Sequence, residues 1–169
     1  KMSIEAWVYP ITYTGYHEAI LSKPGNYTFY LMPDGRLGCY LYGPKPQDYY
    51  VSDSIVPINQ WSHIAPTYDG EKLKFYINGK PDREIPLSGQ FKPCLDRIHN
   101  IEYQKFPLYF GVEDIPRVSN AIPHFWHGQL DEVRILNRVL SEGEIKCDYE
   151  RRKYCPIEPS ILLGQEEQE

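Results

Sequence analysis

Apolar and polar residues alternate strictly in the segment 72–77, which predicts a β-strand with one buried face. The apolar positions are Leu73, Phe75 and Ile77. A period of two places them on one face of the strand and the residues between them on the other. Asp69-Gly70 precedes this segment and Asn78-Gly79 follows it, and both dipeptides favour tight hairpin turns. We therefore predict that residues 61–80 form three short antiparallel strands in succession.

Further strands are predicted on both sides of this meander. Residues 3–9 are apolar at nearly every position, which is typical of a central strand. Turn residues at 33–35 join two strand-like segments in a second hairpin. The other predicted strands are 20–22, 27–31, 37–42, 51–56, 108–112 and 125–135. Pro66 lies inside the first strand of the meander and predicts a bulge or an edge position, because proline has no amide donor.

A single short helix is predicted near the end of the chain. Ser141-Glu-Gly-Glu144 has the spacing of a capping box, in which Ser141 and Glu144 each accept a hydrogen bond from the other's backbone amide. Leu140 and Ile145 stand where a hydrophobic staple would fix the helix entry. We expect the helix to run from 142 to 151, with a final edge strand at 161–163.

The composition favours a loop-rich β-domain over a helical bundle. The chain has 169 residues, of which 15 are proline, 12 are glycine and 15 are tyrosine, and this length is enough for one two-layer domain. A net charge of −5 argues against a nucleic-acid surface, since phosphates require concentrated Lys and Arg. No apolar stretch reaches the roughly 20 residues that span a bilayer, so no membrane insertion is expected.

The sequence begins inside a predicted strand, at Lys1-Met-Ser-Ile-Glu-Ala-Trp7. No secretory signal precedes that strand, so we interpret the sequence as a piece of a longer polypeptide that has further domains. We assign residues 1–164 to one folded domain and 165–169 to a polar tail, because the tail has nothing to bury.

Four cysteines allow three disulfide connectivities, and they are Cys39, Cys94, Cys147 and Cys155. Cys147 and Cys155 flank the end of the predicted helix, which favours a local disulfide and leaves Cys39 with Cys94. The alternative is that these residues are buried free thiols, which pack as small apolar groups. Asn26-Tyr27-Thr28 is also a glycosylation acceptor in a predicted turn. Together these features favour an extracellular or cell-surface location.

Four segments carry a recognisable set of residues in a fixed order. The central one reads Trp61-Ser-His63-Ile-Ala65, then Thr67-Tyr68-Asp69-Gly70, and ends at Asn78-Gly79-Lys80. The other three are Ile4-Glu-Ala-Trp7-Val8, Leu108-Tyr-Phe-Gly111 and Phe125–Ser141. Together they cover most of the chain and resemble the laminin-G-like, concanavalin A-like jelly-roll modules, a fold that hosts lectins, glycosidases and adhesion modules alike.

This resemblance implies an antiparallel two-sheet jelly-roll sandwich with one short C-terminal helix. It implies that Trp7 and Trp61 pack in the core and that His63 belongs to the scaffold. In many such modules the aspartate that matches Asp131 lies at or near a calcium site, so we expect calcium there or, alternatively, hydrogen bonds that hold a strand corner. A strand usually precedes residue 1 in this family, and we expect its absence to leave a sheet edge open.

The acidic residues lack the spacing of a glycosidase. Glycoside hydrolysis normally uses two carboxyl groups about 5 Å apart or further, whereas Asp131 and Glu132 are neighbours on a strand and point to opposite faces. No nucleophile or phosphate-loop motif occurs. His124 and His127 stand three positions apart and therefore also face opposite ways, which argues against zinc. We expect no catalytic residue and no cofactor other than calcium.

Sugar binding requires aromatic rings for stacking and a few convergent polar groups. The accessible aromatic candidates are Tyr13, Tyr16, Tyr49, Tyr50 and Trp126. For each of them, packing in a half-buried strand is the alternative. We expect a non-catalytic recognition module that binds a glycan or a matrix or cell-surface protein. Two alternatives stay open: a glycoside hydrolase whose acids meet from different strands, and a structural or assembly spacer.

Overall fold

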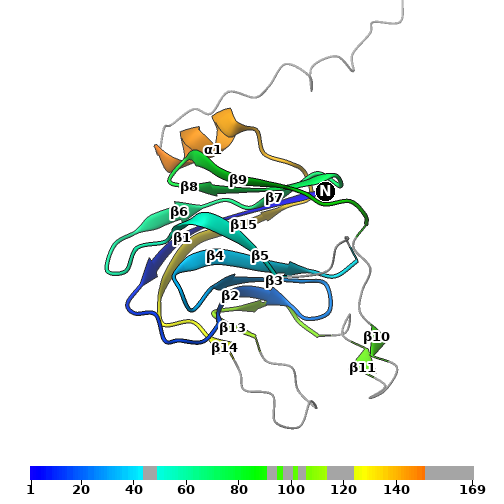
Figure 1. Cartoon of the computed structure of the whole chain (residues 1–169), viewed down its shortest axis with the longest axis horizontal. Helices are drawn as coiled ribbons and strands as arrows, with labels where there is room; N and C mark the ends of the chain where they lie inside the picture. The colour runs from blue at the N-terminus through cyan, green and yellow to red at the C-terminus, as the bar shows by residue number, and fades with distance from the viewer. Residues whose placement is uncertain (44–48, 91–94, 97–100, 103–105, 114–123, 151–169) are drawn as a thin grey trace, which may run out of the picture.

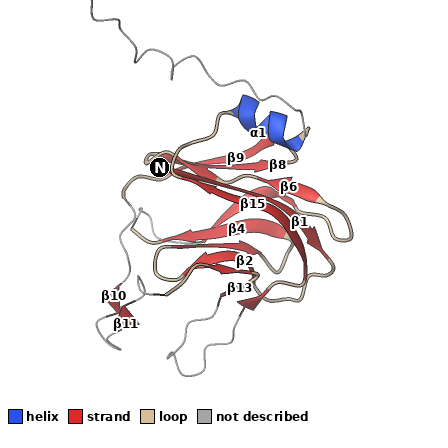
Figure 2. Ribbon diagram, turned by 180° about the vertical axis from the view of Figure 1, so that it is seen from behind, coloured by secondary structure: helices blue, strands red, loops and turns tan. Residues whose placement is uncertain are grey.

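The computed structural model describes residues 1–43, 49–90, 95–96, 101–102, 106–113 and 124–150. Within these residues, two antiparallel sheets are stacked face to face and a single helix lies outside one of them (Figure 1). Figure 2 shows the same arrangement from behind, with the helix over the edge formed by β8 and β9. The predicted all-β jelly-roll sandwich with one helix is confirmed.

The first sheet is built around β1. Its order in the described residues is β15-β1-β6-β8-β7, with β9 paired to β8. The bounds are β1 Met2–Pro10, β6 Ser62–Ile64, β7 Thr67–Tyr68, β8 Lys72–Ile77, β9 Lys80–Pro86 and β15 Gly128–Leu136. Strands β6 and β7 both pair with β1 and with β8, so they are one strand that Pro66 interrupts. The predicted irregularity at Pro66 is therefore present, in a central position rather than at an edge.

The second sheet contains the remaining long strands. Its order is β12-β2-β3-β4-β5. The bounds are β2 Glu18–Lys23, β3 Tyr27–Leu31, β4 Arg36–Leu41, β5 Tyr49–Ile55 and β12 Tyr109–Phe110. Two short hairpins complete the described strands: β10 Leu95–Asp96 with β11 Ile101–Glu102, and β13 Val112–Glu113 with β14 His124–Phe125. The β13–β14 hairpin lies beside β2.

Turn chemistry explains why β8 and β9 form a tight hairpin. Asn78 and Gly79 have φ values of 52° and 71°, as a two-residue turn with the correct twist requires. The Asn78 side chain also accepts a hydrogen bond from the His63 amide at 2.9 Å, which ties the turn to β6. The two turns predicted from Asp69-Gly70 and Asn78-Gly79 are both found where the sequence places them.

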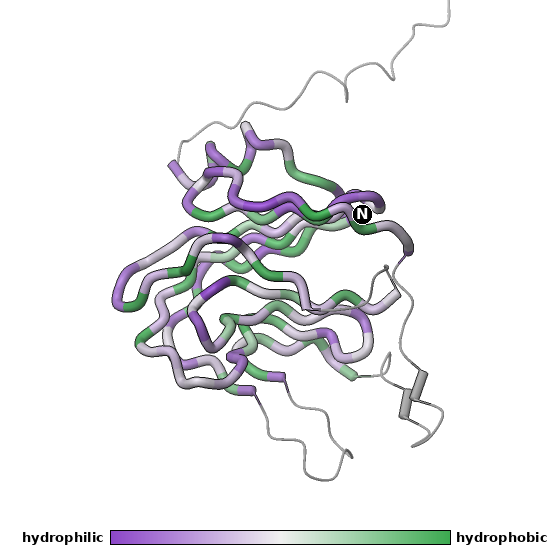
Figure 3. The backbone as a smooth tube through the Cα atoms, viewed as in Figure 1, coloured by the Kyte–Doolittle hydropathy of each residue, from purple (hydrophilic) through white to green (hydrophobic). Residues whose placement is uncertain are grey.

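The hydrophobic core lies between the two sheets. Alternate residues of β1 point into it, as do Leu73 and Phe75 of β8. From the second sheet, every other residue of β3 and β4 meets them, for example Phe29 and Leu37. Figure 3 shows apolar residues recurring along the strands of both sheets. Strand residues of the opposite parity therefore point away from the core on each outer face.

Part of the outer face of the first sheet is covered by α1 (Glu142–Tyr149). Ser141 caps its N-terminus, and the Ser141 and Glu144 side chains each accept from the other's backbone amide, so the predicted capping box is confirmed. Leu140 and Ile145 are buried in a second small apolar cluster with Tyr76. This helix is why the outward-pointing Tyr76 is only 2% exposed, although its lysine neighbours on the same face are solvated.

Two residues depart from the expectations for the core. Trp61 is 39% exposed and packs edge-on against Tyr9, so the prediction that it lies in the core is wrong; it precedes β6 and lies outside the sheet. Trp7 is buried as expected, but beneath Tyr149 of α1 rather than between the sheets.

The cysteine prediction is corrected in part. Cys39 is a free thiol with 0% exposure, on the core side of β4, so its predicted disulfide is wrong. Burial raises the pKa of this thiol well above its ordinary value, which keeps it protonated. Cys94 and Cys155 lie outside the described residues, as do the predicted strand at 161–163 and the tail at 165–169. The pairing of Cys147 with Cys155 stays a prediction.

Candidate functional site

Five aromatic side chains meet on the outer side of the second sheet, and we call this set the aromatic face. Its members are His17, Tyr30, Tyr40, Tyr49 and His124. Tyr30 follows Phe29 on β3, and Tyr40 follows Cys39 on β4, so alternation turns both tyrosines away from the core.

Tyr49 is the centre of the aromatic face. Its ring centroid lies 5.0 Å from that of His17, 5.2 Å from that of Tyr40 and 5.9 Å from that of Tyr30. The His17 and His124 rings are 5.7 Å apart at the other end. Tyr49 is 44% exposed whereas Tyr30 is 3% exposed, so a ligand would meet Tyr49 first and Tyr30 lies beneath it.

A carboxylate stands next to this cluster. Glu113 on β13 accepts hydrogen bonds from the hydroxyls of Thr28 at 3.0 Å and Tyr30 at 2.5 Å. A longer contact of 3.5 Å links it to Ser22. Burial and then the Glu113 charge raise the pKa of Tyr30 far above its ordinary value, so this phenol stays a neutral donor. Glu113 thereby connects the β13–β14 hairpin to β2 and β3.

The imidazole of His17 is neutral at pH 7. Burial lowers its pKa, the neighbouring His124 lowers it further, and Glu113 opposes both effects. One nitrogen of a neutral imidazole donates a hydrogen bond and the other accepts one. His124 is held in place through its Nδ1, which lies 3.0 Å from the backbone oxygen of His17. The aromatic face thus combines stacking surfaces with neutral polar groups.

The structure separates the five tyrosine and tryptophan residues that the sequence proposed for ligand contact. Tyr49 belongs to the aromatic face, and Tyr16 is 68% exposed next to His17 in the chain. Tyr13 packs against the core and donates to the Val56 carbonyl at 2.8 Å. Tyr50 is 6% exposed and belongs to the core, and Trp126 is partly buried and packs against the core. The expectation that Tyr50 is accessible is therefore corrected: on β5 it points inward where Tyr49 points outward.

Four members of the aromatic face were not predicted from the sequence. Tyr30 and Tyr40 could have been identified, because each alternates with core residues in a hairpin whose register the 33–35 turn sets. His17, His124 and the adjacent Glu113 come from a loop and a small hairpin that no periodic pattern places. Their proximity arises only from the contact of β13 and β14 with β2.

Asp131 holds a local backbone irregularity. Its Oδ1 accepts a hydrogen bond from the Glu132 amide at 2.8 Å, and Glu132 has a φ of 47°, in the left-handed region. Asp131 lies inside β15, where the register with β1 shifts between Glu5 and Trp7, so this hydrogen bond holds a bulge within the strand. Among the described residues, no three His, Cys, Asp or Glu side chains are grouped so that they could hold a metal ion. Calcium binding at Asp131 stays a prediction.

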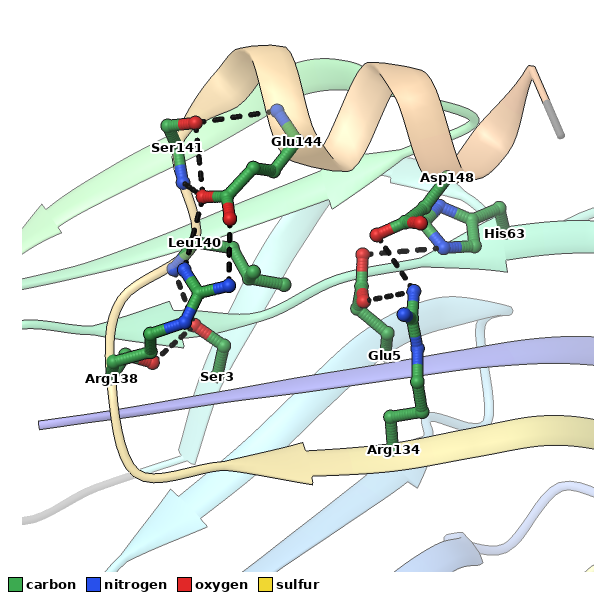
Figure 4. Close-up of polar contacts among 9 residues, drawn as sticks. All are labelled: Ser3, Glu5, His63, Arg134, Arg138, Leu140, Ser141, Glu144 and Asp148. Carbon is green, nitrogen blue, oxygen red and sulfur yellow. Dashed lines mark hydrogen bonds and ion pairs between the residues drawn. The ribbon is translucent and has the colours of Figure 1, made fainter. Parts of the chain in front are cut away.

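A second polar cluster lies beneath α1 and is structural in character (Figure 4). Glu5 of β1 is 1% exposed and lies 2.6 Å from Arg134, which in turn contacts Asp148 of α1 at 2.7 Å. His63 approaches the other Glu5 oxygen at 3.6 Å. Because these contacts run from the helix to both strands, the cluster joins α1 to β1 and β15.

The scaffold that carries both clusters matches a known family. The sequence profile of the Concanavalin A-like lectin/glucanases superfamily matches residues 1–146. The chain belongs to this superfamily. No curated protein sequence matches the chain, and no helix among the described residues is long and apolar enough to cross a membrane.

Solved structures share the fold at low sequence identity. A protein from Bacteroides ovatus assigned to carbohydrate binding is similar with a TM-score of 0.64 and 18% identity, over 86% of this chain and 39% of that one. A second similar structure is domain 4 of AbnA, a GH43 extracellular arabinanase from Geobacillus stearothermophilus, in complex with arabinotriose. Its TM-score is 0.56 and its sequence identity 21%, over 88% of this chain and 66% of that one.

A toxin structure adds a third example. Botulinum neurotoxin type C, whose cell entry depends on interaction with two ganglioside molecules, gives a TM-score of 0.58 and 17% identity, over 90% of this chain and 36% of that one. The present chain therefore spans from 36% to 66% of the length of these three structures. At these identities the likeness establishes the shared fold.

Proposed function

We propose that this protein is a non-catalytic module that binds glycans on the aromatic face. The observation that carries the proposal is the exposed ring of Tyr49, which is surrounded by Tyr40, Tyr30 and His17 at 5.0 to 5.9 Å. Sugars present C–H groups on one side of the ring, and aromatic side chains with a polar tip bind such groups while donating hydrogen bonds. The carbohydrate-binding structures of the same fold support this choice of ligand.

Each group in the aromatic face has a distinct role. Tyr49 supplies the stacking surface, and Tyr40 extends it along the neighbouring strand. The neutral imidazole of His17 donates or accepts hydrogen bonds with sugar hydroxyls. Glu113 positions Tyr30 beneath Tyr49 by accepting its hydroxyl hydrogen.

The charge pattern does not suit glycoside hydrolysis. Within the described part of the chain, Glu113 is the acid whose charge acts on the pKa values of Tyr30, Tyr49 and His17. A glycosidase normally requires a second carboxyl group opposite the first. Binding without turnover is thus the function that this arrangement supports.

We place the module outside the cell, as part of a longer polypeptide. The acceptor triplet that begins at Asn26 supports this location: Asn26 stands in the turn between β2 and β3, partly exposed and therefore within reach of modification. A disulfide between Cys147 and Cys155 would agree with it, since disulfides persist in oxidising compartments.

The test is a glycan array probed with the purified protein, with calcium and again with a chelator. We expect binding to a defined set of glycans, and we expect Tyr49→Ala to reduce it at least about tenfold, as the loss of one stacked ring does at other sites. Trp61→Ala is the matched control, because Trp61 is similarly exposed at 39% but packs against Tyr9 of β1, away from the aromatic face.

Three outcomes separate the possibilities. Loss of binding in Tyr49→Ala but not in Trp61→Ala supports the aromatic face. The reverse pattern would move the site to the Trp61 end of the molecule and contradict the proposal. No binding to any glycan on the array would favour a protein ligand or a structural role. Loss of binding in the presence of the chelator would support Asp131 as a calcium ligand.

A further inference from the structure

The aromatic face lies beside a carboxylate, Glu113, that forms no ion pair with a lysine or arginine among the described residues. The Glu113 carboxylate accepts hydroxyl hydrogens from Thr28, Tyr30 and, at a longer distance, Ser22. Neutral hydroxyls orient a carboxylate but leave its net charge in place.

Three groups near this charge, Tyr30, Tyr49 and His17, are neutral at pH 7. Tyr30 and Tyr49 are phenols whose pKa values are raised by burial and by Glu113. His17 is an imidazole whose pKa is lowered by burial and by His124. None of these three groups can supply the positive charge that a ligand carboxylate would need.

The two connections in the sequence next to Tyr49 and Glu113 contain equal numbers of positive and negative residues. Residues 44–48 link the strands that carry Tyr40 and Tyr49, and they contain one lysine and one aspartate. Residues 114–123 link β13 to β14, and they contain one arginine and one aspartate. Each of these segments therefore has no net charge.

We propose that the aromatic face selects neutral oligosaccharides and rejects those that carry a carboxylate, such as sialylated or uronic-acid-bearing glycans. This inference rests on the proposed function and specifies its ligand class. Proteins that bind carboxylates usually hold them with a guanidinium fork or a lysine, and here a ligand carboxylate would instead approach Glu113. Juxtaposed like charges disfavour an interface.

The experiment compares matched ligands in titration calorimetry. The probes are lactosamine oligosaccharides with and without terminal sialic acid, and xylan oligosaccharides with and without glucuronic acid. At low salt we expect the acidic member of each binding pair to bind about tenfold more weakly than the neutral member, as charges a few ångströms apart near a protein surface imply. Raising the salt concentration from about 0.01 M to about 1 M should reduce the difference in affinity between the neutral and acidic ligands, because salt screens the repulsion.

Glu113→Gln removes the charge while keeping the shape of the side chain. We expect this variant to bind the neutral and acidic members within about threefold of each other, since the repulsion is gone. Glu132→Gln is the matched control: Glu132 is an exposed carboxylate on β15 of the other sheet, and the tenfold preference should persist in this variant. If Glu113→Gln does not fold, Glu132→Gln decides the matter: a preference for neutral ligands that persists in this variant supports the inference, and a loss of the preference overturns it.

The outcomes distinguish this inference from the proposed function. Equal or tighter binding of the acidic members by the wild-type protein overturns the neutral selection while leaving glycan binding intact. If the preference for neutral ligands fell equally in both variants, the overall charge of −5 would be its cause, and the proposed role of Glu113 would be overturned. No binding of any neutral or acidic probe, together with a silent array, contradicts the proposed function itself.

Discussion

At the scale of single residues, Glu5 and His63 show how burial alters titration. The Glu5 carboxylate is 1% exposed, and desolvation raises its pKa from 4.5 to about 7, although Arg134 opposes the shift. Desolvation lowers the pKa of His63 from 6.5 to about 4. At neutral pH the imidazole is therefore uncharged, and its 3.6 Å contact with Glu5 is not an ion pair.

These two shifts make opposite contributions to the pH dependence of folding. Because the Glu5 pKa is raised on folding, its favourable contribution is present below about 4.5 and is lost as the pH rises through 7. Because the His63 pKa is lowered on folding, the contribution of His63 to stability is present above about pH 6.5 and is lost as the pH falls through 4.

The isosteric variant Glu5→Gln isolates the carboxylate, since His63 is unchanged in both proteins. Between pH 4.5 and pH 8 we expect the free energy of unfolding of the wild-type protein to fall by about 3 kcal/mol relative to that of the variant. Urea denaturation at several pH values measures this difference. A difference that does not vary with pH would mean that Glu5 titrates normally.

At the scale of elements, the pairing of β1 with β15 depends on a glycine. A Cβ at Gly128 would lie 2.1 Å from the Tyr9 carbonyl oxygen, which is closer than atoms can approach. Gly143 in the first turn of α1 is different, because the nearest atom to an added Cβ is the Ser141 oxygen at 3.9 Å. One glycine is required by backbone contact and the other is not.

Two alanine substitutions test this contrast. Gly128→Ala should destabilise the fold by about 2 kcal/mol or more, because the backbone of β1 must move. Gly143→Ala should stabilise it by roughly 0.5–1 kcal/mol, since alanine is the better helix former. Thermal unfolding of both variants checks the prediction. Comparable effects of the same sign would show that the close approach at Gly128 is absent.

The elements that sequence reasoning located are those with a period or a turn signal. The alternation in β8, the Asn78-Gly79 turn and the capping box of α1 are all local, so their patterns were sufficient. The prediction that Trp61 lies in the core was wrong because the family pattern does not show where β6 begins. Trp61 directly precedes the strand and stays exposed. Tyr49 and Tyr50 illustrate the other limit: only the register of β5 with β4 decides which of two adjacent tyrosines points outward.

At the scale of the whole molecule, the two outer faces of the sandwich have different uses. The outer face of the first sheet is partly covered by α1 and holds the Glu5–Arg134–Asp148 contacts. The second sheet carries the aromatic face on its outer side. The sandwich thus holds the side chains of the aromatic face in fixed positions, which lowers the entropic cost of binding a ligand.

A nuclear magnetic resonance titration of tyrosine- and histidine-labelled protein, with a glycan selected by the array, locates the binding surface. We predict that the ring signals of Tyr40, Tyr49 and His17 shift on binding, while those of Tyr9 and Tyr149 on the first-sheet side stay unchanged. Shifts confined to Tyr9 or Tyr149, with the signals of Tyr40 and Tyr49 unchanged, would show that the glycan does not bind on the aromatic face.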